Sequence, residues 1–158
     1  KGHYDYIKFY LDNPDVKQVR LYIGEKARDT ITLKQTEAML SIYGLMDHPK
    51  LVYCKATARE GKNGTYTNPL ADCYDYAEVC VTEPVALGCS SKDAIYKDRF
   101  QKYFDNIRRG VVDAPIFQQQ DDLSATDFRN ALVMNEPIHN FLPDHVNEEE
   151  ISELFKAQ

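Results

Sequence analysis

A short segment late in the chain, Leu123-Ser-Ala-Thr-Asp-Phe-Arg129, has the residue types of an anion-binding helix start. Ser124 or Thr126 can cap a helix there, and the free backbone N–H groups of its first turn attract an anion. Arg129 follows one turn further into the helix and adds a full positive charge. The segment suits a bound phosphate, although an ordinary N-cap followed by a surface arginine has the same pattern.

A second group of residues with chemical potential opens the chain as Lys1-Gly2-His3, directly ahead of a predicted helix. A histidine at a helix N-terminus can donate a hydrogen bond to a phosphoryl oxygen, and a preceding glycine lets the backbone pass close to it. A solvated histidine is the alternative interpretation. The two segments together favour a phosphate site more than either does alone.

The elements that must position these residues follow from hydrophobic spacing, glycines and prolines. Helices are predicted over 1–14, from the Thr32/Gln35 capping-box pattern onward, and over 69–79, 124–133 and 148–155. A charged helix before residue 110 has an apolar face formed by Ile95, Phe100, Tyr103, Phe104 and Ile107. Strands are predicted over 18–24, 51–54, 84–88 and 115–117, and the polar segment 59–68 can form a hairpin through Asn63-Gly64.

This alternation of strands and helices predicts an α/β fold, a three-layer sandwich whose mostly parallel sheet has helices on both faces. At 158 residues the chain fits a single domain, 1–158, with a helical tail over about 136–158. Ligands of such sheets bind beyond the carboxyl ends of the strands. The chemically informative residues do follow the predicted strands.

Gly2-His3 and Leu123-Ser-Ala-Thr-x-x-Arg129 together resemble the HxGH nucleotidyltransferase superfamily, whose motifs are His-x-Gly-His and Ile-Ser-x-Thr-x-x-Arg. The group includes nicotinamide-mononucleotide and phosphopantetheine adenylyltransferases and the cytidylyltransferases of lipid head-group synthesis. Asn140-Phe-Leu-Pro143 resembles a segment of some relatives, including phage-encoded ones. The resemblance implies a Rossmann-like fold, and it places the first strand and the first histidine ahead of Lys1, outside this sequence.

The resemblance also implies roles for residues after other strands. Lys26 and Arg28 are candidates for the acceptor's phosphate, with solvated loop charges as the alternative. Gly88 would let the backbone approach the nucleotide, and Asp93 would meet a ribose hydroxyl or cap the next helix. His3, Ser124, Thr126 and Arg129 would bind the triphosphate, which leaves His3, Arg129 and Lys26 as the expected catalytic residues.

The implied reaction transfers a nucleoside monophosphate from a nucleoside triphosphate with Mg²⁺ to a phosphorylated small molecule, and it releases pyrophosphate. The resemblance makes AMP the expected group, because adenylyl transfer is the commoner activity among relatives. In addition, Gln119, Gln120, Asp121 and Asp122 stand where cytidylyl enzymes often carry arginine and glycine. Two alternatives stay open: a nucleotide-binding or assembly module of the same fold without turnover, and an unrelated Rossmann-like domain.

The composition limits the remaining functions. A net charge of −6 argues against a broad nucleic-acid-binding face, and no apolar run is long enough to span a bilayer. Reduced, mostly buried thiols are expected at Cys54, Cys73, Cys80 and Cys89, with one disulfide as the alternative. The expected location is the cytoplasm (that of the host for a viral protein), and self-association is left open. His48, His139 and His145 are predicted to be structural or surface residues.

Overall fold

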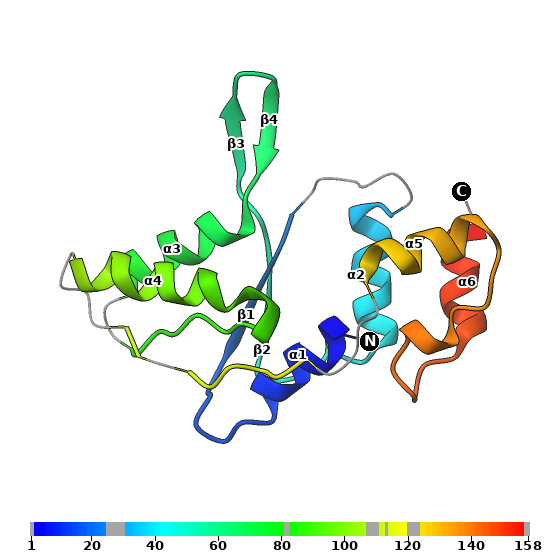
Figure 1. Ribbon diagram of the computed structural model, residues 1–158, viewed down its shortest axis with the longest axis horizontal. Helices are drawn as coiled ribbons and strands as arrows, with labels where there is room; N and C mark the ends of the chain where they lie inside the picture. The colour runs from blue at the N-terminus through cyan, green and yellow to red at the C-terminus, as the bar shows by residue number, and fades with distance from the viewer. Residues whose placement is uncertain are drawn as a thin grey trace.

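The computed structural model describes residues 2–24, 31–80, 83–106, 111–112, 114–119 and 124–156, and it shows a mixture of helices and short strands (Figure 1). The first half contains α1 (Gly2–Leu11), β1 (Val19–Ile23), α2 (Leu33–Ile42), β2 (Leu51–Lys55), β3 (Ala58–Gly61) and β4 (Gly64–Thr67). The second half contains α3 (Pro69–Val79), η1 (Ser91–Asp93), α4 (Ala94–Asn106), α5 (Ala125–Val133), η2 (His139–Phe141) and α6 (Glu148–Lys156). None of the described helices is both long and apolar enough to cross a membrane.

The predicted parallel pairing is present between β1 and β2, which run in register from Val19 opposite Leu51 to Ile23 opposite Lys55. One face of this two-stranded sheet, including Leu21 and Tyr53, packs against the larger hydrophobic core cluster. On the other face, the guanidinium of Arg20 lies 4.1 Å from the ring centre of Tyr76 in α3. The side chains of this sheet therefore meet helices on both faces, as the strand–helix alternation predicts.

Two separate cores hold these layers together. Buried residues of α1, α2, α5 and α6, among them Ile7, Leu40, Phe128 and Ile151, form the first core cluster. The second cluster is smaller and consists of Ala77 in α3 with Phe100 and Phe104 in α4. In Figure 1 the strands β1 and β2 lie between the helix group α3–α4 and the group α2, α5 and α6.

The strands predicted over 84–88 and 115–117 are not formed as regular strands. The two segments run in parallel, but only one isolated bridge joins them, between Ser90 and Phe117. Phe117 donates its N–H to the Cys89 carbonyl at 3.0 Å, and Ser91 donates to the Phe117 carbonyl at 2.7 Å. No continuous ladder forms at Gly88 and Cys89, because tyrosine hydroxyls of α1 bond to their backbone groups.

The predicted capping box at the start of α2 is confirmed, and its Gln35 also bonds to a distant helix. The Thr32 hydroxyl accepts from the backbone N–H of Gln35 at 3.2 Å, and the side-chain amide oxygen of Gln35 accepts from the backbone N–H of Thr32 at 2.8 Å. The Gln35 amide nitrogen also donates to the Leu154 carbonyl in α6 at 3.2 Å. Gln35 thus closes its own helix start and joins it to the last helix of the described chain.

The polar segment after β2 forms the β3–β4 hairpin, which projects from the rest of the molecule (Figure 1). Gly61 pairs with Gly64, so the turn residues are Lys62 and Asn63. The turn is therefore one residue earlier than the predicted Asn63-Gly64, because it is Gly64, with φ 106°, that takes the left-handed backbone conformation.

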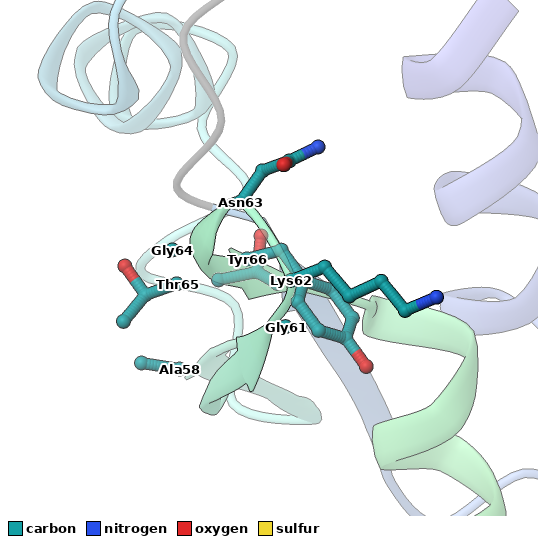
Figure 2. Close-up of a pocket in the computed structure, with 8 residues that line it drawn as sticks. Ala58, Gly61, Lys62, Asn63, Gly64, Thr65 and Tyr66 are labelled. Carbon is teal, nitrogen blue, oxygen red and sulfur yellow. The ribbon is translucent and has the colours of Figure 1, made fainter.

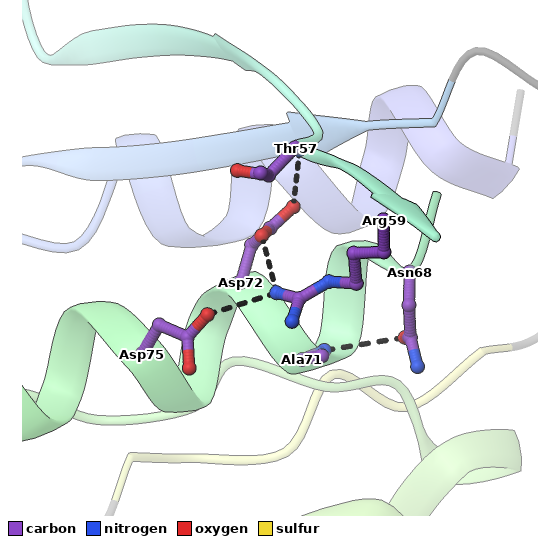
Figure 3. A network of polar contacts seen from close by, with 6 residues as sticks. All are labelled: Thr57, Arg59, Asn68, Ala71, Asp72 and Asp75. Atoms are coloured by element: carbon purple, nitrogen blue, oxygen red, sulfur yellow. Dashed lines mark hydrogen bonds and ion pairs between the residues drawn. The ribbon is translucent and has the colours of Figure 1, made fainter. Parts of the chain in front are cut away.

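An ion-pair network anchors the base of the hairpin to α3 (Figure 3). Arg59 of β3 donates to Asp72 and to Asp75, each at 2.8 Å. The Asp72 carboxylate is buried and also accepts the backbone N–H of Thr57 at 3.0 Å. A two-stranded hairpin alone is only marginally stable in water, so these contacts stabilise it and fix its base against α3.

The apolar face predicted for α4 is only partly correct. Phe100 and Phe104 are buried, whereas Ile95 and Tyr103 are 55% and 41% exposed, and Ile107 lies outside the described residues. The buried positions are four residues apart, which is a narrower stripe than predicted. They pack with Ala77 and Tyr74 of α3 and with Val85, Leu87 and Val111.

We expect Phe104→Ala to lower the free energy of unfolding by about 3–5 kcal/mol, because it opens a cavity beside Phe100 in the smaller core. Ile95→Ala, on the same helix, is the matched control and should change it by at most about 0.5 kcal/mol. Urea denaturation followed by circular dichroism measures both. Equal losses for the two variants would contradict the described packing of α4.

Because Tyr43 is buried, we expect the free energy of unfolding to fall in alkali. Burial raises the pKa of Tyr43 to about 12 in the folded protein, whereas an unfolded tyrosine titrates near about 10. The neutral form favoured by folding gives its full stabilisation below pH 10, and this is lost as the pH rises from 10 towards 12. Denaturation at a series of pH values should therefore show a shallower decline over this window in Tyr43→Phe. An unchanged slope in that variant would contradict the role of Tyr43.

Candidate phosphate-binding site

The start of α5 has the geometry predicted for an anion-binding turn. Ser124 is the N-cap, and its hydroxyl accepts the Asp127 N–H at 3.0 Å. Phe128 and Ala131 are buried in the larger core, so the helix start is held on a rigid base. The N–H groups of Ala125 and Thr126 belong to the first turn, where a helix supplies no acceptor of its own. Of the two capping residues considered from the sequence, Ser124 is the cap.

Arg129 brings its positive charge back to this turn. Its guanidinium donates from Nη2 to the Thr126 hydroxyl at 3.1 Å, so the charge is held over the first turn instead of extending away from it. Thr126 itself is exposed. Asp127 is also in the first turn and places a carboxylate there, which offsets part of the positive potential. The positive potential available to an anion at this turn therefore comes mainly from Arg129.

His3 lies in the first turn of α1, near Asp93 at the junction of η1 and α4. The residue is exposed, yet the atoms around its ring displace enough water to lower the pKa of His3, and the Asp93 carboxylate opposes this shift. A hydrogen bond of 2.5 Å from the Tyr6 hydroxyl to the Gly88 carbonyl joins the same helix to the same segment. The helix α1, which carries His3, thus lies beside the segment that carries Gly88 and Asp93.

Gly88 has a packing reason for being glycine. A Cβ at this position would lie 3.0 Å from Cε2 and 3.1 Å from Cζ of the Tyr10 ring. The Tyr10 hydroxyl accepts the Cys89 N–H at 3.0 Å and donates to the Pro115 carbonyl at 2.6 Å. The close approach to a nucleotide expected at Gly88 is occupied here by a tyrosine of the same chain.

The structure places the predicted residues in two regions. Ser124, Thr126 and Arg129 share one helix start, and His3 lies on α1, which the Tyr6–Gly88 hydrogen bond joins to the segment of Gly88 and Asp93. The helices α5 and α1 both contribute to the larger core, through Phe128 and Ile7. Lys26 and Arg28, the candidates for the acceptor's phosphate, lie outside the described residues, as does Leu123.

Sequence reasoning missed the roles of Tyr6 and Tyr10. Their hydroxyls hold the backbone at Gly88, Cys89 and Pro115. Their spacing of four residues, on a helix ahead of a predicted buried strand, is the one signal that could have suggested a shared target. Nothing in the sequence names that target.

The remaining histidines and the cysteines show no sign of a metal site in the part of the chain that the structure describes. No group of three or more His, Cys, Asp or Glu side chains suited to a metal ion occurs within the described ranges. The His145 ring contacts the Tyr43 carbonyl at 2.9 Å, and His48 accepts the Lys50 N–H at 3.1 Å. The four cysteines, all of them described, keep their thiols as expected, but only Cys89 is buried.

Two hollows of the described surface lie away from the α5 start. One of about 620 Å³ is lined by Ala58 and residues 61–67 of the hairpin (Figure 2). Another, of about 480 Å³, lies over the acidic start of α6 and includes Glu149 and Glu153. Neither contains a residue that the sequence suggested for phosphate binding.

Comparisons with known proteins supply no relative from which a function could be transferred. No family model, curated protein or solved structure matches the chain. The functional argument therefore depends on the residues and their geometry.

Gly88→Ala should lower the free energy of unfolding by about 1–3 kcal/mol without any ligand, because the new methyl group overlaps the Tyr10 ring. The same substitution in a Tyr10→Ala background should cost much less, since the overlap is gone. Urea denaturation of the four proteins of this double-mutant cycle gives the coupling between the two sites. Additive losses would show that Gly88 is not there to accommodate Tyr10.

Proposed function

We propose that the protein is a nucleotidyltransferase that moves a nucleoside monophosphate from a nucleoside triphosphate to a phosphorylated small molecule. The observation that carries the proposal is the start of α5, where the Ser124 cap, the first-turn N–H groups and the Arg129 guanidinium held at Thr126 converge. This arrangement suits the β- and γ-phosphates of a triphosphate, which need several donors and a fixed positive charge.

The proposed reaction needs alignment and charge stabilisation more than covalent chemistry. An oxygen of the acceptor's phosphate attacks the α-phosphorus, the bond from that phosphorus to the bridging oxygen breaks, and pyrophosphate leaves. Arg129 and the α5 start stabilise the negative charge on the leaving pyrophosphate. His3 donates a hydrogen bond to a phosphoryl oxygen near the reacting phosphorus.

Mg²⁺ would be carried to the site by the triphosphate, whose hard oxygens are ligands that this ion prefers, and it would neutralise phosphate charge there. The donors at the α5 start are N–H, hydroxyl and guanidinium groups, which are suited to the remaining phosphate oxygens. Lys26 or Arg28 is proposed to hold the acceptor's phosphate. AMP is the proposed group for transfer, since Gln119, Gln120, Asp121 and Asp122 replace the arginine and glycine frequent in cytidylyl enzymes.

The Rossmann-like three-layer sandwich is likewise a proposal. Its support is the parallel pairing of β1 with β2, the parallel bridge from Ser90 to Phe117 and the helices on both sides of the strands. In such a sandwich, Gly24 and Ser90 follow the carboxyl ends of their strands, at the edge where ligands bind.

Arg129→Ala tests the proposal directly. In the wild type, ATP with Mg²⁺ at 100 times its Kd should stabilise the fold by about 2.7 kcal/mol, seen as a rise in melting temperature. In Arg129→Ala this stabilisation should largely disappear, and pyrophosphate release with an accepted acceptor should fall about 30- to 1,000-fold, the equivalent of about 2–4 kcal/mol.

Arg99→Ala removes an exposed arginine from α4 and is the control for net charge. No stabilisation of the wild type by any nucleoside triphosphate would overturn the proposal. Stabilisation by ATP without pyrophosphate release from any acceptor would favour the non-catalytic nucleotide-binding module.

A further inference from the structure

The β3–β4 hairpin presents an aromatic ring to solvent in a fixed position. Tyr66 is 50% exposed, and its ring lies across Gly61, where a Cβ would be 3.1 Å from Cδ1 and Cε1. Gly61 is thus free of a side chain at the place where the ring of Tyr66 rests. One side of the ring is supported by the hairpin, which leaves the ring available for a planar group to stack on.

A positive charge accompanies this ring. Lys62 lines the same hollow of about 620 Å³, and Figure 2 shows its side chain running in the same direction as that of Tyr66. Gly61 and Gly64 also line the hollow. An exposed ring beside an ammonium group fits a ligand that has both a planar ring and a negative charge.

The base of the hairpin is fixed to α3 and to the end of β1. Arg59 fixes its base through the carboxylates of Asp72 and Asp75, as Figure 3 shows. At the same end of β1, a Cβ on Gly24 would lie only 2.8 Å from the Thr67 hydroxyl oxygen of β4. The hairpin therefore adjoins the end of β1.

We propose that Tyr66 and Lys62 form a stacking site for the planar ring of a phosphorylated ligand. Tyr66 stacks on the ring, and Lys62 binds an anionic group of the same ligand. The hairpin site does not depend on the proposed function: its ligand needs a planar ring and an anionic group, and aliphatic phosphates would bind poorly.

Calorimetric titration with two probes tests the stacking site without any need for catalysis. The probes are adenosine 5′-monophosphate and ribose 5-phosphate, which share a sugar phosphate and differ by the ring. The wild type should bind the ring-bearing probe, and Tyr66→Ala should weaken it about 5- to 150-fold while Tyr66→Phe keeps the affinity. Lys62→Ala should also weaken binding, and Glu60→Ala, on the opposite face of the hairpin, should not.

Arg129→Ala separates this inference from the proposed function. Loss of ATP binding in Arg129→Ala, with binding of adenosine 5′-monophosphate retained, supports two distinct sites. Binding of the monophosphate that depends on Arg129 and not on Tyr66 overturns the hairpin site and leaves the nucleotidyltransferase proposal intact. Equal affinity for the two probes, or no binding of either, also overturns the hairpin site. Failure of ATP to bind overturns the proposed function alone if Tyr66 still governs the monophosphate.

Discussion

The Tyr10 hydroxyl is the contact on which the central part of the fold depends. It accepts the Cys89 N–H and donates to the Pro115 carbonyl, and thereby joins three segments that have no regular ladder between them. Each of these polar groups would cost about 1–3 kcal/mol if it were buried without a partner. The ring of the same residue fills the space beside Gly88. One side chain thus fixes α1 against the middle of the chain, while Ile7 and Leu11 of α1 build the larger core.

The local elements could be read from the sequence because each has a short-range cause. Thr32 and Gln35 predict the start of α2, and Pro69 predicts the start of α3; both helices begin where their capping residues place them. The hairpin was foreseen from its polar, glycine-bearing composition, with the turn one residue away from its true place. These signals act within a few residues, so no knowledge of the tertiary structure is needed.

The elements that were wrong depend on partners far along the chain. The segment 84–88 is apolar and ends in glycine like a buried strand, yet its bonding is set by Tyr6 and Tyr10, about 80 residues earlier. Ile95 has the right spacing for the inner face of α4, yet it is 55% exposed and takes no part in the smaller core cluster. In the candidate site, the Ser124 cap was predictable from residue type. The return of Arg129 to Thr126 was not, because several rotamers of an arginine are compatible with the same helix.

The long-range bonds of Tyr10 also have a consequence for the order in which the protein can fold. Its partners are 79 and 105 residues further along the chain, so during synthesis α1 leaves the ribosome long before Pro115 has been made. Until Cys89 has been made, the Tyr10 hydroxyl has neither of these partners, and the apolar side of α1 has no complete core to join. The first helix of the sequence is therefore among the last to reach its final place, and contacts of such high sequence separation are expected to slow folding.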